Sequence, residues 1–278
     1  MIDLHAHSNR SDGTLSPTEL VRLAARTGLS ALALTDHDTV GGVDEAVEAA
    51  RAEGIRFLGG VEFEADFSPG RLHILGIALA DWHGRIEELL IEMRERRTAR
   101  NHKIIEKMKA AGISATMEEV EAIAVGTVVG RPHFAELLVR RGIVRTIQEG
   151  FDRYLGSGKR FYAKRENLKP AEVAGLIREA GGKAVVAHPL SLKVNPRRLR
   201  SLFEEFKAMG IEGVEAYHAN APLAVAEQIA GIAKEVGMFV TAGSDFHGDY
   251  RPDRRLGYGA GGRPIDDSFL LPFLDDRP

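Results

Sequence analysis

The chain has 278 residues, of which 44% are hydrophobic, and these values suffice for one large or two modest folded domains and exclude disorder as the main state. Its 37 basic and 40 acidic residues give a formal net charge of -3, so no global positive field draws the protein to nucleic acid or to a membrane. The absence of cysteine excludes disulfides, thiolate metal sites and a cysteine nucleophile.

The N-terminal segment lacks the basic and apolar runs of a signal peptide, and no apolar stretch reaches membrane-spanning length. We therefore expect a cytoplasmic protein without a membrane partner, although a chain without cysteine fits either redox compartment. The sequence leaves the oligomeric state open.

The first part of the chain predicts alternating strands and helices. Ser16, Pro17 and Glu19 supply an N-cap, a proline at the first helical position and an acidic first turn. Two β-leaning stretches meet across the turn-like Ser68-Pro69-Gly70. In chain order we expect a strand opening residues 1–13, a helix ending at about 28, a strand at 29–35, a helix at about 43–54, and strands within 55–67 and 72–79.

The last part of the chain repeats this alternation, and the middle interrupts it. Residues 85–164 are helical and charged without a convincing strand, so we interpret them as an inserted helical subdomain between barrel segments 1–84 and 165–278. Alternating elements of this length argue for a parallel barrel or a doubly wound sheet. The later elements are strands at 183–188, 211–218 and 238–246, with helices near 170–181, 196–209 and 221–236.

Side chains that can bind metal recur at the expected strand ends. His5 and His7 point the same way in an extended strand, and the turn at Asp12-Gly13 would let a carboxylate fold back toward them. We expect each strand to end, at its carboxyl side, in such a residue, which is the edge where barrel enzymes build their sites. The candidate ligands are His5, His7, Asp12, His37, Glu62, His73, His188, Asp245 and His247.

Each of these residues taken alone reads more readily as an ordinary hydrogen-bonded side chain, and only their coincidence predicts a metal centre. Asp245 and His247 repeat the two-residue spacing of His5 and His7. So many donors exceed the need of one ion, so we expect two or three divalent ions that share Glu62 or Asp245 as a bridge. Mixed imidazole and carboxylate donors favour Mn²⁺, with Fe²⁺, Zn²⁺ or Mg²⁺ as alternatives. Adjacent ions of this kind activate water and neutralise charge in phosphoryl transfer.

Together these motifs resemble those of the PHP (polymerase and histidinol phosphatase) family of metal-dependent phosphoesterases. The resemblance covers residues 1–79 and 183–250 and implies a distorted (β/α)7 barrel with a trinuclear metal centre. The motifs are His5-x-His7-x4-Asp12-Gly13, Thr35-Asp-His-Asp38, Glu62, His73, His188-Pro189 and Ser244-Asp-x-His247. By this resemblance one ion would be held by His5, His7, Glu62 and Asp245, a second by Glu62, His73 and His188, and a third by Asp12, His37 and His247. Many relatives have histidine where Asp12 stands, which makes the third site more acidic here.

The insert resembles that of stand-alone family members acting on nucleoside 3′,5′-bisphosphates and on the 5′ ends of short RNA. It carries Gly130-Arg-Pro-His133 and, later, Phe161-Tyr-Ala-Lys164. Arginine and lysine offer donors suited to a second phosphate, while the alternative reading is a solvated basic face. The candidate substrate-binding residues are Arg131, Arg160, Lys164 and Asn220, with Lys159 and Arg165 in the same basic cluster.

The leading hypothesis is a phosphatase that removes the 3′-phosphate of a nucleoside 3′,5′-bisphosphate, such as 3′-phosphoadenosine 5′-phosphate. Asp245 would act within the metal centre, and His218 or a water would protonate the leaving oxygen. The nearest alternative is a 5′–3′ exoribonuclease on short 5′-phosphorylated RNA, followed by a non-catalytic PHP module and a histidinol phosphatase. The lack of net positive charge disfavours long nucleic acids as partners.

Overall fold

The structure is a computed structural model that describes residues 1–124, 129–164 and 167–274. The chain divides into two compact units, which we call the barrel unit (Met1–Leu90 and Asn167–Pro278) and the helical unit (Ile91–Glu166). The division falls inside one long helix, α3 (Arg85–Ala110). Within the described ranges, no helix combines the length and apolar character needed to cross a membrane.

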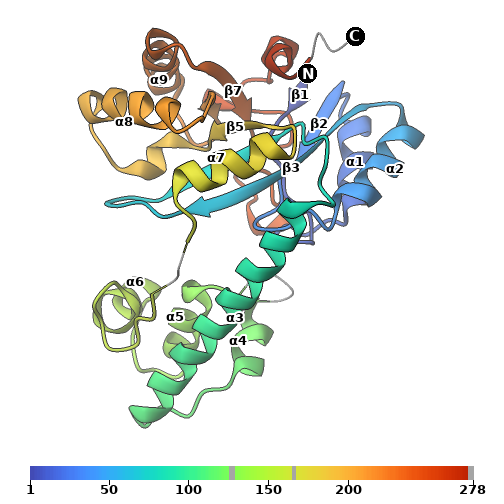
Figure 1. Cartoon of the computed structure of the whole chain (residues 1–278). Helices are drawn as coiled ribbons and strands as arrows, with labels where there is room; N and C mark the ends of the chain where they lie inside the picture. The colour runs from blue at the N-terminus through green and yellow to red at the C-terminus, as the bar shows by residue number, and fades with distance from the viewer. Residues whose placement is uncertain (125–128, 165–166, 275–278) are drawn as a thin grey trace. The chain divides into compact units, whose positions relative to one another are not determined.

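The barrel unit contains a seven-stranded sheet whose spatial order follows the chain. A parallel bridge between Ala6 and Phe246 joins its first and last members, so the sheet is a nearly closed barrel (Figure 1) and the predicted distorted (β/α)7 barrel is confirmed. The strands are β1 (Ile2–Asp3), β2 (Ala31–Leu34), β3 (Arg56–Ala65), β4 (Leu72–Ile77), β5 (Lys183–Val186), β6 (Gly213–His218) and β7 (Phe239–Gly243).

The prediction of a parallel sheet is wrong for one strand, β4. β4 runs antiparallel to both β3 and β5, while the other paired strands are parallel. The physical reason is the length of the link between β3 and β4, residues 66–71, because a parallel pair needs a crossover connection of about a dozen residues or more.

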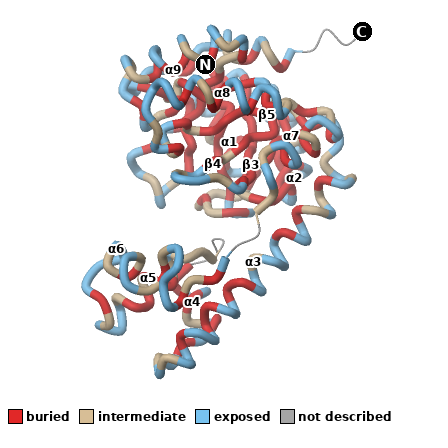
Figure 2. The backbone as a smooth tube through the Cα atoms, turned by 60° about the vertical axis from the view of Figure 1, so that its left-hand side comes forward, coloured by how far each residue is buried: buried red, intermediate tan, exposed pale blue. Residues whose placement is uncertain are grey.

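Helices surround this sheet on its outside (Figure 1). Figure 2 shows the strands as largely buried and the helices as alternately buried and exposed, the pattern of amphipathic helices on a barrel. Ser16 caps the first helix by accepting from the Glu19 backbone N–H, and the Glu19 side chain accepts from the Ser16 backbone in return. The helices are α1 (Pro17–Arg26), α2 (Val43–Glu53), α7 (Pro170–Glu179), α8 (Pro196–Ala208) and α9 (Leu223–Val236), with 3₁₀ turns η2 (Pro189–Leu192), η3 (Gly248–Tyr250), η4 (Ala260–Gly262) and η5 (Asp267–Phe273).

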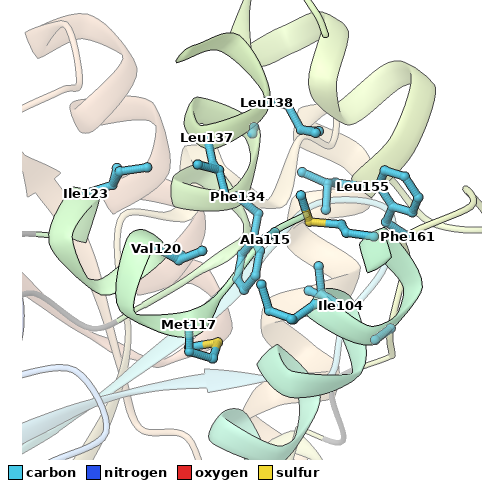
Figure 3. Packing of buried hydrophobic residues seen from close by; sticks show 14 of the residues in the cluster. Ile104, Ala115, Met117, Val120, Ile123, Phe134, Leu137, Leu138, Leu155 and Phe161 are labelled. Carbon is cyan, nitrogen blue, oxygen red and sulfur yellow. The ribbon is translucent and has the colours of Figure 1, made fainter. Parts of the chain in front are cut away.

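The helical unit has its own apolar core, shown in Figure 3. Phe134, Leu138, Leu155 and Phe161 are all buried in it, together with Ile104 from α3. No strand occurs among the described residues of this unit. Besides its part of α3, it contains α4 (Met117–Ala124), α5 (Arg131–Arg140), α6 (Ile147–Gly150) and a π-helical turn η1 (Phe151–Leu155).

Candidate metal centre

The barrel brings the predicted metal ligands to one edge of its sheet. The expectation that each ligand follows the carboxyl end of its strand is wrong for two of them, since Glu62 lies inside β3 and His73 lies near the amino end of β4. Because β4 runs antiparallel, its amino end reaches the edge where the parallel strands have their carboxyl ends. The other ligands follow their strands: His5 and His7 after β1, Asp12 in the next loop, His37 after β2, His188 after β5, and Asp245 and His247 after β7.

Four buried side chains converge at the centre of this edge. His5 Nε2 lies 3.1 Å from His7 Nε2 and 3.4 Å from Glu62 Oε2. Asp245 Oδ1 lies 3.4 Å from His5 Nε2 and 3.3 Å from His7 Nε2, and Glu62 Oε2 lies 3.2 Å from His7 Nε2. Two imidazole nitrogens that face each other between two carboxylate oxygens suit a single cation bound by all four groups, so these residues fit a divalent metal ion.

The two oxygens of Glu62 face different groups of histidines. Oε1 lies 2.7 Å from His73 Nδ1 and 2.9 Å from His188 Nε2. Oε2 faces the four-residue group and also lies 3.1 Å from His37 Nδ1. A carboxylate placed in this way could bridge two metal sites, the role predicted for Glu62 or Asp245.

Asp12 forms a further group with histidines from three parts of the chain. Its Oδ1 lies 3.2 Å from His247 Nε2 and 3.6 Å from His7 Nδ1, and its Oδ2 lies 3.7 Å from His37 Nε2. The donor atoms of these four residues lie within 4.8 Å of one another. The structure thus places Asp12 with His37 and His247, as the family resemblance implies, and adds the ring of His7.

Burial and neighbouring charges shift the pKa values of this centre in opposite directions. Burial would raise the pKa of Glu62, but the surrounding histidine rings hold it well below its usual range. Burial would lower the pKa of His7, but hydrogen bonds from its ring to Asp245 and Glu62 raise it to about 10. At His37 burial prevails and lowers the pKa to about 4. The lowered pKa of Glu62 favours its ionised form, which is the form that binds a cation.

A buried carboxylate that the sequence did not single out supports two of the histidines. Glu215, in β6, accepts from the backbone N–H of His188 at 2.8 Å, and its Oε1 lies 2.9 Å from His5 Nδ1. A carboxylate behind a metal-binding histidine fixes the ring and leaves the other nitrogen free for the ion. The sequence signal that could have revealed it is an acidic residue in the middle of an otherwise apolar strand.

Two further buried carboxylates hold the segments that carry ligands. Asp36 accepts from the Ser8 backbone N–H at 2.8 Å and from the hydroxyls of Ser8 and Ser11, both at 2.6 Å, which fixes the chain just before Asp12. Asp3 accepts from the backbone N–H of Ser244 at 3.0 Å, next to Asp245. Asp36 stands in the Thr35-Asp-His-Asp38 motif, but the sequence did not indicate this role for either carboxylate.

The backbone is strained at two ligands. His188 has a φ of 26° and Asp245 a φ of 54°, values that non-glycine residues rarely adopt. Such strain persists where surrounding contacts determine the conformation, and it is typical of functional sites.

His218, the predicted general acid, is buried at the end of β6. Its Nε2 lies 3.3 Å from Asp245 Oδ2 and 3.0 Å from Arg254 Nη1. The backbone N–H of Asn220 donates to its Nδ1 at 3.2 Å, while the Asn220 residue is exposed. Arg254 is buried, and the sequence did not distinguish it from its charged neighbours between Arg251 and Arg255.

The other predicted substrate-binding residues lie in the helical unit. Arg131, the first residue of α5, is half-buried, and its guanidinium lies 6.0 Å from the Phe151 ring centre and 5.7 Å from that of Tyr162. Arg160 and Lys164 are exposed. Of the rest of the predicted basic cluster, Lys159 is exposed as well, and Arg165 lies outside the described residues.

Known proteins resemble this chain over most of its length. The sequence profile of the PHP domain matches residues 3–155. A 5′–3′ exoribonuclease of Haemophilus influenzae is 38% identical over 245 residues, covering 88% of this chain and 89% of that protein. A 3′,5′-nucleoside bisphosphate phosphatase of Chromobacterium violaceum is 34% identical over 258 residues, covering 92% and 90%. The structure of an amidohydrolase from Chromobacterium violaceum superimposes with a TM-score of 0.78 at 33% identity, covering 95% of this chain and 92% of that one.

Proposed function

Since the chain belongs to the PHP domain family and is a metal-dependent phosphoesterase, we propose that it removes the 3′-phosphate from a nucleoside 3′,5′-bisphosphate. The observation that carries the choice of substrate is Arg131. Its guanidinium lies near two aromatic rings, and no carboxylate of the described residues forms a salt bridge with it. A guanidinium in such a place suits an anion such as a second phosphate.

The metal centre would be held by the predicted ligands around Glu62. When bound, the ions supply an activated water and neutralise the charge that develops on the phosphoryl group. The mixed donor set favours Mn²⁺. Glu62 contacts His73 through one carboxylate oxygen and His7 through the other, so it links the two groups of ligands. Glu215 contacts His5 Nδ1 and so orients the His5 ring.

The remaining residues would bind and orient the substrate. Arg131, Arg160 and Lys164 supply cationic donors for the 5′-phosphate, and Asn220 is exposed just after β6, where it could meet the sugar. The leaving 3′ oxygen needs a proton, which would come from His218 or from a water.

A second candidate activity uses the same centre. The Haemophilus influenzae relative is a 5′–3′ exoribonuclease, and anchoring a 5′-phosphate is a step common to both reactions. A nucleoside 3′,5′-bisphosphate resembles the 5′ end of an RNA chain, so one enzyme could perform both. The net charge of -3 favours short RNA over long.

The test compares turnover of the metal-loaded enzyme on 3′-phosphoadenosine 5′-phosphate, adenosine 3′-monophosphate, short 5′-phosphorylated RNA and histidinol phosphate. We expect the bisphosphate to be preferred over the monophosphate. Arg131→Ala should reduce that preference by about 10–100-fold, the value of one or two charge-assisted hydrogen bonds. Arg145→Ala, which changes an exposed arginine of the same unit, should leave it unchanged.

Two results would contradict the proposal. An unchanged preference in Arg131→Ala would show that the helical unit does not recognise the 5′-phosphate through this residue. Faster turnover of histidinol phosphate than of either nucleotide would show that the substrate is not a nucleotide. Faster turnover of the RNA than of the bisphosphate would favour the exoribonuclease activity.

A further inference from the structure

We propose that Arg254 and His218 are positioning residues that together hold the outer oxygen of Asp245, so that this carboxylate offers one defined oxygen to the metal centre. Both residues act on the metal centre described above. It depends on the chain being a metal-dependent phosphoesterase and not on which phosphoester it hydrolyses.

The two oxygens of Asp245 face in different directions. Oδ1 lies 3.4 Å from His5 Nε2 and 3.3 Å from His7 Nε2, within the four-residue group. Oδ2 lies 3.3 Å from His218 Nε2 and 3.4 Å from Arg254 Nη1, outside that group. Rotation of the carboxylate would break both sets of contacts, so the second set determines which oxygen the metal centre receives.

The hydrogen bonds of His218 indicate its role. The Asn220 backbone N–H donates to Nδ1, and Nε2 lies 3.3 Å from Asp245 Oδ2, so groups of the protein itself engage both ring nitrogens. The Arg254 guanidinium, which stays protonated in proteins, lies 3.0 Å from the same Nε2. A cation already occupies that side of the ring, which makes His218 a poor metal ligand although it lies near His5 and Glu215.

Arg254 is an unusual residue for this position because it is only 4% exposed. Its Nη1 lies 3.2 Å from the Ser244 carbonyl oxygen, and its Nε lies 3.2 Å from Asp253 Oδ2. A buried guanidinium is costly unless carboxylates and carbonyls surround it. Arg254 thus contacts the Ser244 carbonyl group, directly before Asp245, and the Asp245 side chain. Asp245 is the residue with the strained φ of 54°. The guanidinium therefore braces both the backbone and the side chain of this ligand.

The consequence for the reaction is that both ring nitrogens of His218 are engaged by Asp245, Arg254 and Asn220 rather than by the leaving oxygen. The proton for that oxygen then comes from water. This separates two roles that the sequence could not separate, because a histidine just beyond a strand end fits either one.

The first experiment measures metal content and affinity, without activity, by elemental analysis and chelator competition with Mn²⁺. We expect Arg254→Met to weaken one bound ion by about 10–100-fold, the usual effect of removing a residue that orients a ligand. Arg254→Lys should weaken it in the same direction but less, because it keeps the charge and loses the planar donors. Arg255→Met is the matched control, since Arg255 is exposed and its guanidinium lies over the Tyr258 ring.

The sign of the effect makes this test decisive. If Arg254 acted only as a positive charge near the centre, its removal would strengthen cation binding. Unchanged or tighter Mn²⁺ binding in Arg254→Met would therefore overturn the proposal. If that variant does not fold, Arg254→Lys still separates the two roles, because a role of charge alone predicts unchanged Mn²⁺ binding and the proposal predicts weaker binding.

The second experiment separates a positioning role of His218 from that of a proton donor. It compares 4-nitrophenyl phosphate, whose leaving group needs no proton, with glycerol 2-phosphate, whose leaving group does. Loss of a general acid would slow only the second substrate, by about 10²–10⁴-fold. We expect His218→Leu to slow both substrates equally and to weaken metal binding, and His218→Gln, which can still donate an N–H to Asp245, to restore most of both.

A selective loss on glycerol 2-phosphate in His218→Gln would assign the proton to His218 and overturn the proposal. Failure of the nucleotide proposal would look different. In that case the nucleotides would be poor substrates for the wild-type enzyme, while the metal affinities and the two leaving groups would still report on Arg254 and His218.

Discussion

The metal centre of the barrel unit and the core of the helical unit are built from opposite kinds of side chain. In the barrel unit, buried carboxylates and imidazoles such as Glu62 and His7 meet at the edge of the sheet. In the helical unit, the buried cluster consists of apolar residues such as Phe134 and Leu138 (Figure 3), and the Tyr154 and Phe161 rings stack 5.0 Å apart. The barrel unit has buried apolar clusters as well, so the buried charged groups at its edge are what distinguishes it from the helical unit.

The metal centre and the apolar core differ in what stabilises them. An apolar core is stabilised by burial alone and needs no ligand. A buried group of ionised carboxylates is costly unless cations or hydrogen bonds compensate it, and its arrangement therefore suits bound metal ions. We infer that changes in one of them should leave the other intact.

The largest effect is expected at the bridging carboxylate. Glu62→Gln removes the charge shared by two groups of histidines, so we expect the loss of more than one ion per chain and a fall in activity beyond the about 10–100-fold typical of residues that only support a ligand. Metal analysis and turnover measure this. Hydrogen exchange of residues 91–124 should not change, and Glu48→Gln, at an exposed position, is the control. Full metal content in Glu62→Gln would refute the bridging role.

The second prediction reverses the comparison. Phe134 is fully buried, so Phe134→Ala should destabilise the helical unit by about 3–5 kcal/mol, and Phe134→Leu by less. Hydrogen exchange of α5 and denaturant unfolding measure the loss. Metal content should remain that of the wild type, because the ligands lie in the barrel unit. Loss of metal in Phe134→Ala would show that the interiors are coupled.

Much of the fold follows from local signals in the sequence. Ser16, Pro17 and Glu19 mark the start of α1, and the helix begins at Pro17. The strands were predictable because short apolar runs end in polar residues, as β2 does before Thr35. The family resemblance then organised these elements into a barrel with a metal centre.

The rest depends on contacts between residues far apart in the chain. His5 meets Glu215 across 210 positions, and Arg254 meets His218 across 36, so no local pattern tells which residues will pair. The direction of β4 could be inferred only from the short link before it. The inserted segment was predictable as helical, but its division into α3, α4, α5 and α6 was not, because its charged composition varies little along the chain.

The third prediction compares one helix cap in each unit. The Ser16 hydroxyl accepts from the Glu19 backbone N–H at 3.2 Å, and the Thr146 hydroxyl accepts from that of Glu149 at 3.1 Å. Ser16→Ala and Thr146→Ala should each cost about 1 kcal/mol. Each loss should appear only in its own unit, followed by Trp82 fluorescence for the barrel unit and by hydrogen exchange for the helical unit. If either variant lowered the stability of both units equally, the two units would not be independent of each other.

The smallest effect is expected at an ion pair on the rim of the barrel unit. Glu45 accepts from the Thr18 hydroxyl and the Arg10 guanidinium, both at 2.8 Å. Burial would raise its pKa, but these hydrogen bonds lower it below the usual value of 4.5. A depressed pKa in the folded state means that the stabilisation is present above pH 4.5 and is lost as the pH falls through the folded value.

Glu45→Gln should therefore destabilise the barrel unit by about 0.2–1 kcal/mol at pH 7, and the difference from the wild type should shrink as the pH falls below 4.5. Denaturant unfolding followed by Trp82 fluorescence at several pH values measures this difference. High salt should reduce it as well, because the pair is partly exposed. If the difference in stability stayed constant down to pH 3, Glu45 would act through its shape and not through its charge. The charge on the rim of the barrel unit would then contribute nothing to its stability.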